Sequence, residues 1–93
     1  MSYAFNYIQV AINTKDNEPV MAGKTFKDLK EALDDYYGAD GEQAEYLGWT
    51  PSEDPNYQGV MKYKWYREGG TDDKIEWEPV IDTLKVYEIW FNR

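Results

Sequence analysis

Residues 25–38, Thr-Phe-Lys-Asp-Leu-Lys-Glu-Ala-Leu-Asp-Asp-Tyr-Tyr-Gly, decide the fold, because they form the one clearly helical segment of the chain. Thr25 can cap the first turn in a capping-box-like pattern with Asp28, and Gly38 stands where a left-handed C-terminal cap belongs. Apolar side chains recur in this segment so that they form one stripe along a helix; they are Phe26, Leu29, Leu33 and Tyr36 or Tyr37. We therefore predict a helix over residues 25–37 with one buried face.

The segment before this helix predicts two paired strands. In residues 4–13, the apolar residues Ile8, Val10 and Ile12 alternate with other residues at the period of two that is typical of a strand with one apolar face. Residues 14–19 are dense in turn formers. We expect a short strand at residues 20–22 to pair back on the first.

The segment after the helix predicts a second, shorter helix over residues 41–47. Asp40 and Gln43 have the spacing of a helix cap, and Gly48 would end the helix. Residues 50–58 contain two prolines, which exclude a central strand, so we expect a loop there.

The second half of the chain predicts a β-hairpin over residues 60–78. Apolar residues alternate with polar ones on both sides of residues 68–73, which contain the glycines and aspartates of a turn. If the alternating apolar residues share one buried face, the charged residues between them pair across the other face. The buried face would contain Met61, Tyr63, Trp65, Ile75 and Trp77, and the charged face Lys62, Lys64, Glu76 and Glu78.

Residues 83–91 predict a last strand that is apolar on both faces. One face would carry Leu84, Val86 and Trp90, and the other Tyr87, Ile89 and Phe91. A strand of this kind lies in the centre of a sheet or has one face in an interface. It therefore raises the hypothesis of a homodimer, or of a structural subunit that assembles through strand 83–91.

Together these segments predict an α+β fold. We expect a four- or five-stranded, mainly antiparallel sheet with the helix 25–37 packed on one face and a short second helix at 41–47. A chain of 93 residues allows one modest core, so residues 1–93 are interpreted as a single domain.

The composition excludes several classes of function. The chain contains no cysteine and no histidine, which removes thiolate nucleophiles, zinc–thiolate sites and the usual general base near neutral pH. Its 18 acids and 10 bases give a formal charge of −8, which opposes direct binding to nucleic acids or anionic membranes. No signal peptide or membrane-spanning stretch is recognisable, so we expect a cytoplasmic protein.

The acids are unevenly distributed along the chain. Residues 31–61 contain eight of them and no base, so the remaining ten acids balance the ten bases. Like charges three or four residues apart on a helix are mildly destabilising, and several aromatic residues lie among these acids. Such a surface is typical of a protein that meets a cationic partner.

We therefore predict a small acidic, non-enzymatic binding protein that acts as an inhibitor or adaptor. Its partner would be a basic protein surface, for example that of a nuclease or another nucleic-acid-binding protein, engaged by mimicry of nucleic-acid charge. Small inhibitors encoded by phages or other mobile elements provide the analogy. The expected partner-binding residues are Glu31, Asp34, Asp35, Tyr37, Asp40, Glu42, Glu45, Tyr46, Trp49, Glu53 and Asp54.

Three alternatives compete with this hypothesis. The acids can simply solvate exposed faces and improve solubility. Residues 34–45 superficially resemble a calcium loop, but Gly41 does not fit the EF-hand register, so no metal or cofactor is expected. No phosphate-binding loop or nucleophile motif occurs, and catalytic residues are not expected.

Overall fold

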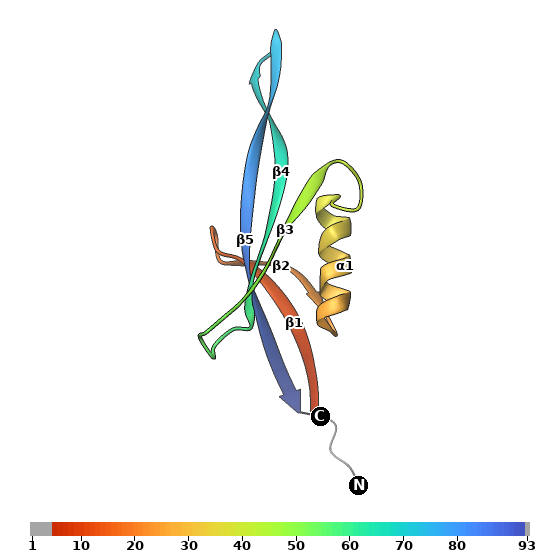
Figure 1. The fold of residues 1–93 in the computed structure, drawn as a ribbon, viewed down its shortest axis with the longest axis vertical. Coiled ribbons are helices and arrows are strands. Elements are labelled where there is room, and N and C mark those ends of the chain that lie inside the picture. The colour runs from red at the N-terminus through yellow and green to blue at the C-terminus, as the bar shows by residue number, and fades with distance from the viewer. Residues whose placement is uncertain (1–4, 93) are drawn as a thin grey trace.

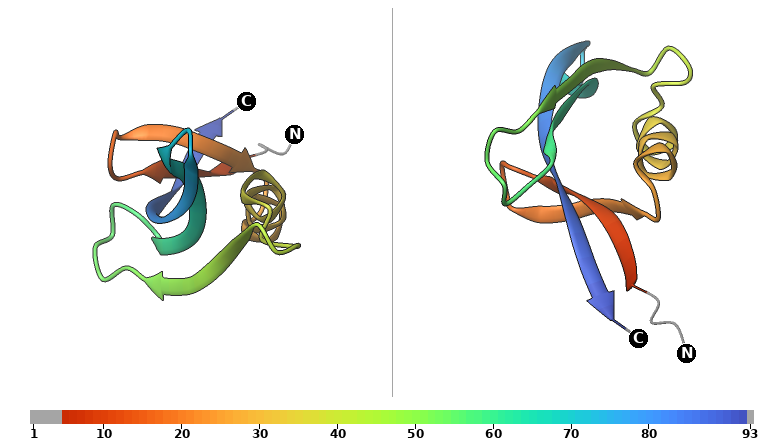
Figure 2. Two further views of the ribbon diagram at one scale, coloured as in Figure 1. Left: turned by 90° about the horizontal axis from the view of Figure 1, so that it is seen from above. Right: turned by 60° about the horizontal axis from the view of Figure 1, so that its bottom comes forward.

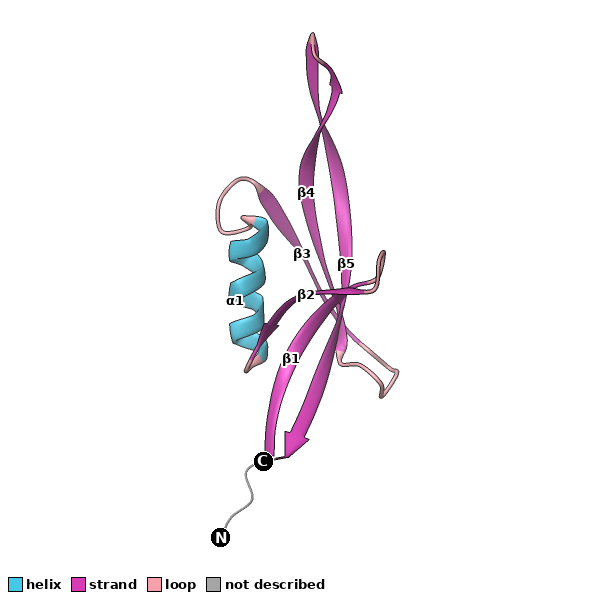
Figure 3. Ribbon diagram, turned by 180° about the vertical axis from the view of Figure 1, so that it is seen from behind, coloured by secondary structure: helices cyan, strands magenta, loops and turns pink. Residues whose placement is uncertain are grey.

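The computed structural model describes residues 5–92, with side chains from Tyr7 to Trp90. The first residue of the predicted strand 4–13 and the side chain of Phe91 lie outside the described part. Five strands and one helix make up this part of the chain (Figures 1 and 3). They are β1 (Phe5–Asn13), β2 (Glu18–Gly23), α1 (Phe26–Tyr37), β3 (Ala44–Pro51), β4 (Gly59–Thr71) and β5 (Lys74–Asn92).

The strands form one antiparallel sheet in the order β2-β1-β5-β4-β3. The α+β class and the antiparallel sheet with a helix on one face are confirmed. β5 is the central strand, because it pairs with β4 over Lys74–Val86 and with β1 over Leu84–Asn92. A central position is one of the two alternatives predicted for residues 83–91, although only Leu84–Val86 pair on both sides.

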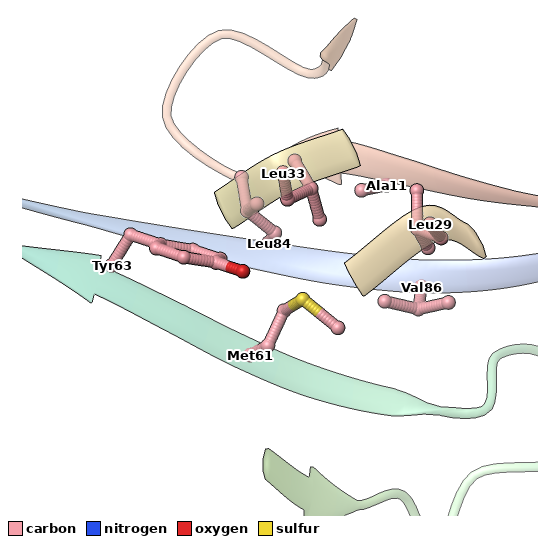
Figure 4. Close-up of a cluster of buried hydrophobic side chains, with 7 residues drawn as sticks. All are labelled: Ala11, Leu29, Leu33, Met61, Tyr63, Leu84 and Val86. Atoms are coloured by element: carbon pink, nitrogen blue, oxygen red, sulfur yellow. The ribbon is translucent and has the colours of Figure 1, made fainter. Parts of the chain in front are cut away.

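The sheet curves around the helix, so that both edge strands reach toward it (Figure 2). Side chains from α1, β1, β4 and β5 meet between the two layers (Figure 4). This core consists of Ala11, Leu29, Leu33, Met61, Tyr63, Leu84 and Val86, all fully buried. Phe26 and Trp49 close the core at the β3 edge, with ring centroids 4.7 Å apart in an edge-to-face arrangement.

Both predicted caps of the helix are confirmed. The Thr25 hydroxyl accepts a hydrogen bond of 3.0 Å from the backbone N–H of Asp28. Gly38 adopts the left-handed conformation, with φ of 81°, and its N–H donates to the carbonyl oxygen of Asp34. The helix has 12 residues, and within residues 5–92 no helix is long and apolar enough to cross a membrane.

β1 and β2 pair as predicted, although β2 is longer than residues 20–22. The core side chain of β1 is Ala11, which faces the helix, and the alternating Ile8, Val10 and Ile12 lie on the opposite face of the strand. At the end of β2 the helix approaches closely, because a Cβ atom on Gly23 would lie 2.6 Å from the backbone nitrogen of Leu29. Glycine therefore allows the helix to start directly against this strand.

The predicted second helix at residues 41–47 is wrong. Residues 38–43 form turns, and Ala44–Pro51 form the edge strand β3, which extends into the predicted loop 50–58. The apparent cap at Asp40 and Gln43 is part of the turn. The aromatic residues Tyr46 and Trp49 explain why a strand forms here in place of a helix. A bulge between Tyr46 and Gly48 allows both side chains to pack on the core.

The hairpin exists, but its predicted register is wrong. The turn consists of Asp72 and Asp73 alone, and the two glycines belong to β4, so Met61 pairs with Leu84 and Trp77 with Glu68. Because odd residues of β4 pair with even residues of β5, Trp77 lies on the face opposite Met61. The predicted pairing of lysines 62 and 64 with glutamates 76 and 78 is likewise absent from the described residues, where Glu78 binds Arg67.

The long hairpin gives the molecule an elongated shape of 67 × 25 × 20 Å. β3 pairs with β4 only as far as Trp65, and β1 pairs with β5 only from Leu84 onward. Residues 66–79 therefore form a two-stranded arm that projects beyond the body of the fold (Figure 1).

Candidate functional site

Most acidic side chains of residues 31–54 are exposed, and most form no ion pair with the described residues. Seven of the eight are classed as exposed, and Asp34 alone is half-buried. Within the described chain, the ion pairs are Lys30–Asp34, Arg67–Glu78 and Lys74–Glu76, so Asp34 is also the one acid of this stretch with a cationic partner.

Asp34 has a structural role. It accepts hydrogen bonds of 2.6 Å from the Lys30 ammonium and 2.7 Å from the Tyr63 hydroxyl. Tyr63 is fully buried, so its hydroxyl needs an acceptor inside the fold. The Asp34 carboxylate is therefore used in contacts within the fold. It differs in this from the partner-binding role that the sequence predicts for it.

The exposed acids do not form one continuous surface. Glu53 and Asp54 lie in the loop after β3, about 26 Å along that strand from Glu42, at 3.3 Å per residue. Glu45 lies on β3 itself, where it stands across from Lys64 of β4 in the register without forming an ion pair in the described chain. The remaining four lie between the middle of α1 and the turns that follow it. We call this set the acidic end: Glu31, Asp35, Asp40 and Glu42.

The three aromatic residues in the predicted binding set pack inside the fold. Tyr37 stacks on Tyr63 with centroids 4.5 Å apart, and Tyr46 lies 5.3 Å from the same ring. The Lys30 ammonium lies 4.0 Å from the Tyr46 centroid. Since Trp49 packs against Phe26, all three side chains contribute chiefly to stability.

Two buried hydroxyls in this cluster have perturbed acidity. Burial raises the pKa of Tyr37 and of Tyr63 far above the ordinary value of 10, and the hydrogen bonds that they donate to Asp82 and Asp34 raise it further. Both hydroxyls are therefore protonated donors in the folded protein.

A pocket of about 350 Å³ lies between the end of the helix and the base of the arm. It is lined by Tyr36 and Tyr37 of α1, Trp65 of β4 and Asp82 of β5. Asp82 is only 8% exposed, and its Oδ2 accepts a hydrogen bond of 2.8 Å from the Tyr37 hydroxyl. No lysine or arginine of the described chain forms an ion pair with Asp82. The sequence analysis did not identify this pocket.

The arm carries a second exposed surface, which is apolar. Tyr66, Ile75 and Trp77 lie on one face of the arm, and Trp77 is 64% exposed. The opposite face carries the ion pairs Arg67–Glu78 and Lys74–Glu76. The sequence predicts Trp77 in the core, and the correct register could not be recognised locally. Asp72 and Asp73 lack the Asn-Gly or Asp-Gly pattern that marks a two-residue hairpin turn, and neither has a positive φ.

Among residues 5–92, no three acidic side chains are arranged to hold a metal ion. Comparison with protein-family models, with curated proteins and with solved structures finds no match to this chain. The residues themselves are therefore the basis for a functional proposal.

Proposed function

We propose that this chain is a non-enzymatic binding protein, acting as an inhibitor or adaptor, whose acidic end docks on a basic surface of a protein partner. The observation that carries the proposal is the acidic end itself: four exposed carboxylates without ion pairs follow one another from α1 into the turns. Charges that are unneutralised within a fold are suited to steering a partner of opposite charge.

The exposed apolar face of the arm supports a protein partner. Tyr66, Ile75 and Trp77 offer the aromatic and aliphatic contact area that is enriched at the centres of protein interfaces. The charge of −8 disfavours nucleic acid as the direct ligand. A nuclease or another nucleic-acid-binding protein has the basic groove that fits an acidic surface of this kind.

The test neutralises the acidic end without changing its shape. We expect the fourfold variant Glu31→Gln, Asp35→Asn, Asp40→Asn and Glu42→Gln to fold with unchanged or slightly higher stability, because like-charge repulsion is relieved. The partner is isolated by affinity capture on the wild-type chain. At low salt, the fourfold variant should associate with it about tenfold more slowly than the wild type does. The rate should also depend less on ionic strength. Asp34 is left unchanged because of its structural contacts.

A matched control separates the position of the charges from their total. The variant Glu18→Gln, Glu53→Gln, Asp54→Asn and Asp73→Asn also removes four exposed acids, and it should keep nearly the wild-type rate. Equal slowing by both variants would mean that only net charge matters. Equal rates for all three proteins would mean that the acids merely solvate the surface, and the proposal would be wrong.

Self-association is a second candidate, supported by the end of β5. The helix covers Leu84 and Val86, but Ile89 and Trp90 remain exposed on opposite faces of the strand, with the Trp90 ring 4.8 Å from that of Tyr7. If the face that carries Ile89 is an interface, Ile89→Lys should convert a dimer into a monomer in sedimentation experiments. A wild-type chain that is already monomeric at high micromolar concentration would exclude this candidate.

A further inference from the structure

We propose that the pocket formed by Tyr36, Tyr37, Trp65 and Asp82 receives an arginine side chain of the partner. This inference rests on the proposed function, because it names one group of the basic surface that the acidic end would meet. It assigns a specific contact to residues outside the acidic end.

Asp82 carries a carboxylate that faces the pocket with few partners. The residue is only 8% exposed, and in the described residues its carboxylate has one hydrogen-bond donor, Tyr37, and no ion pair. A buried carboxylate without a cation loses hydration that a neutral hydroxyl replaces only in part. A cation that entered the pocket would supply the missing charge.

The walls of the pocket are mainly aromatic. Three of the four lining residues are aromatic, and aromatic faces attract cations. Tyr36 stands edge-to-face against Tyr37, with an interplanar angle of 89°, and is 61% exposed, so it forms an accessible wall. Aromatic walls around one carboxylate are typical of a site for an organic cation.

The pocket lies at the C-terminal end of α1. Tyr36 and Tyr37 are the last two residues of this helix, and its last turn contains no basic side chain. The carbonyl end of a helix carries a partial negative charge that favours cations.

Arginine fits these features better than lysine does. Its guanidinium group is planar, stacks on aromatic rings and directs several N–H donors toward a carboxylate. It is also less strongly hydrated than an ammonium group, so it loses less on entering a partly buried site. The second carboxylate oxygen of Asp82 receives no hydrogen bond from the described residues and is the expected acceptor.

The test uses N-acetyl-arginine amide, followed by NMR through the backbone signals of the lining residues and the Trp65 indole. We expect saturable shifts that are confined to the pocket, with a dissociation constant of about a millimolar, as suits a single side chain. N-acetyl-citrulline amide, which has nearly the same shape without the charge, should bind at least about tenfold more weakly. N-acetyl-lysine amide should also bind more weakly. Absence of saturation, or equal binding of either control, would overturn the assignment.

Two variants test the residues. Asp82→Asn keeps an acceptor for the Tyr37 hydroxyl but removes the charge, and it should weaken arginine binding at least about tenfold. Tyr36→Ala removes an exposed wall at little risk to folding and should weaken binding several-fold, even if Asp82→Asn fails to fold. Tyr66→Ala, which removes an exposed tyrosine from the arm, is the matched control and should bind as the wild type does. Wild-type affinity in Tyr36→Ala would contradict the proposal.

The result is independent of the test of the acidic end. If arginine fails to bind while association with the partner still depends on the acidic end, the pocket inference is wrong and the proposed function stands. If arginine binds in the pocket while neutralising the acidic end leaves association unchanged, the proposed steering role is wrong and the arginine site stands.

Discussion

Replacing Tyr63 with alanine is expected to lower the free energy of unfolding by about 3–5 kcal/mol, which is the usual cost of truncating a buried aromatic residue. Tyr63 is fully buried, stacks on Tyr37 and is in tilted contact with Tyr46. Its loss would also leave Asp34 without its hydroxyl donor. Small domains have only about 5–15 kcal/mol of stability in total. The variant should therefore lose a large part of its free energy of unfolding.

The matched substitution is Trp77→Ala. Trp77 is the larger residue, yet it lies exposed on the arm, so its removal should change stability by less than about 0.5 kcal/mol. Urea unfolding of both variants, monitored by circular dichroism, measures the contrast. A large loss in Trp77→Ala would restore the register that alternation alone suggests and would contradict the structure. A small loss in Tyr63→Ala would contradict both, because each places Tyr63 in the core.

This contrast shows where the sequence was informative about the fold. The helix could be predicted because its caps and apolar stripe are local signals at Thr25, Gly38 and the leucines between them. The register of the hairpin is not local, because a shift of one residue moves every side chain to the other face. Two glycines beside two aspartates are compatible with turns of several lengths. The predicted turn over residues 68–73 is longer than the two-residue turn that forms.

The candidate site was only partly predictable for a related reason. Charge is visible in a sequence, so the excess of acids over residues 31–54 was found. Which of them have structural contacts depends on more than the sequence pattern. Lys30 is a local partner of Asp34, four residues earlier on the helix, but the second donor, Tyr63, is brought to Asp34 only by the tertiary fold. The pocket joins residues up to 46 positions apart, Tyr36 and Asp82, and no sequence motif connects them.

The buried tyrosines also predict a steep loss of stability in alkali. In the folded protein the pKa values of Tyr37 and Tyr63 lie far above 10, chiefly because of burial and then because of their hydrogen bonds to carboxylates. In the unfolded chain both hydroxyls ionise near pH 10. Below that pH both states are protonated and the contribution is fully present. Above it the unfolded state binds fewer protons than the folded state, so the free energy of unfolding falls as pH rises.

Each tyrosine that stays protonated only in the fold contributes a slope of about 1.4 kcal/mol per pH unit, and two of them give about 2.8 kcal/mol per unit. A domain with about 5–10 kcal/mol of stability should therefore unfold within about two to four pH units above pH 10. Urea unfolding at intervals from about pH 9 upward measures the slope. Tyr37→Phe and Tyr63→Phe should each remove about half of it, whereas Tyr66→Phe, at an exposed position on the arm, should leave it unchanged. If all four proteins share one slope, the two buried hydroxyls are not the groups that set alkaline stability, and the hydrogen bonds that they donate to Asp82 and Asp34 do not hold their protons in the folded chain.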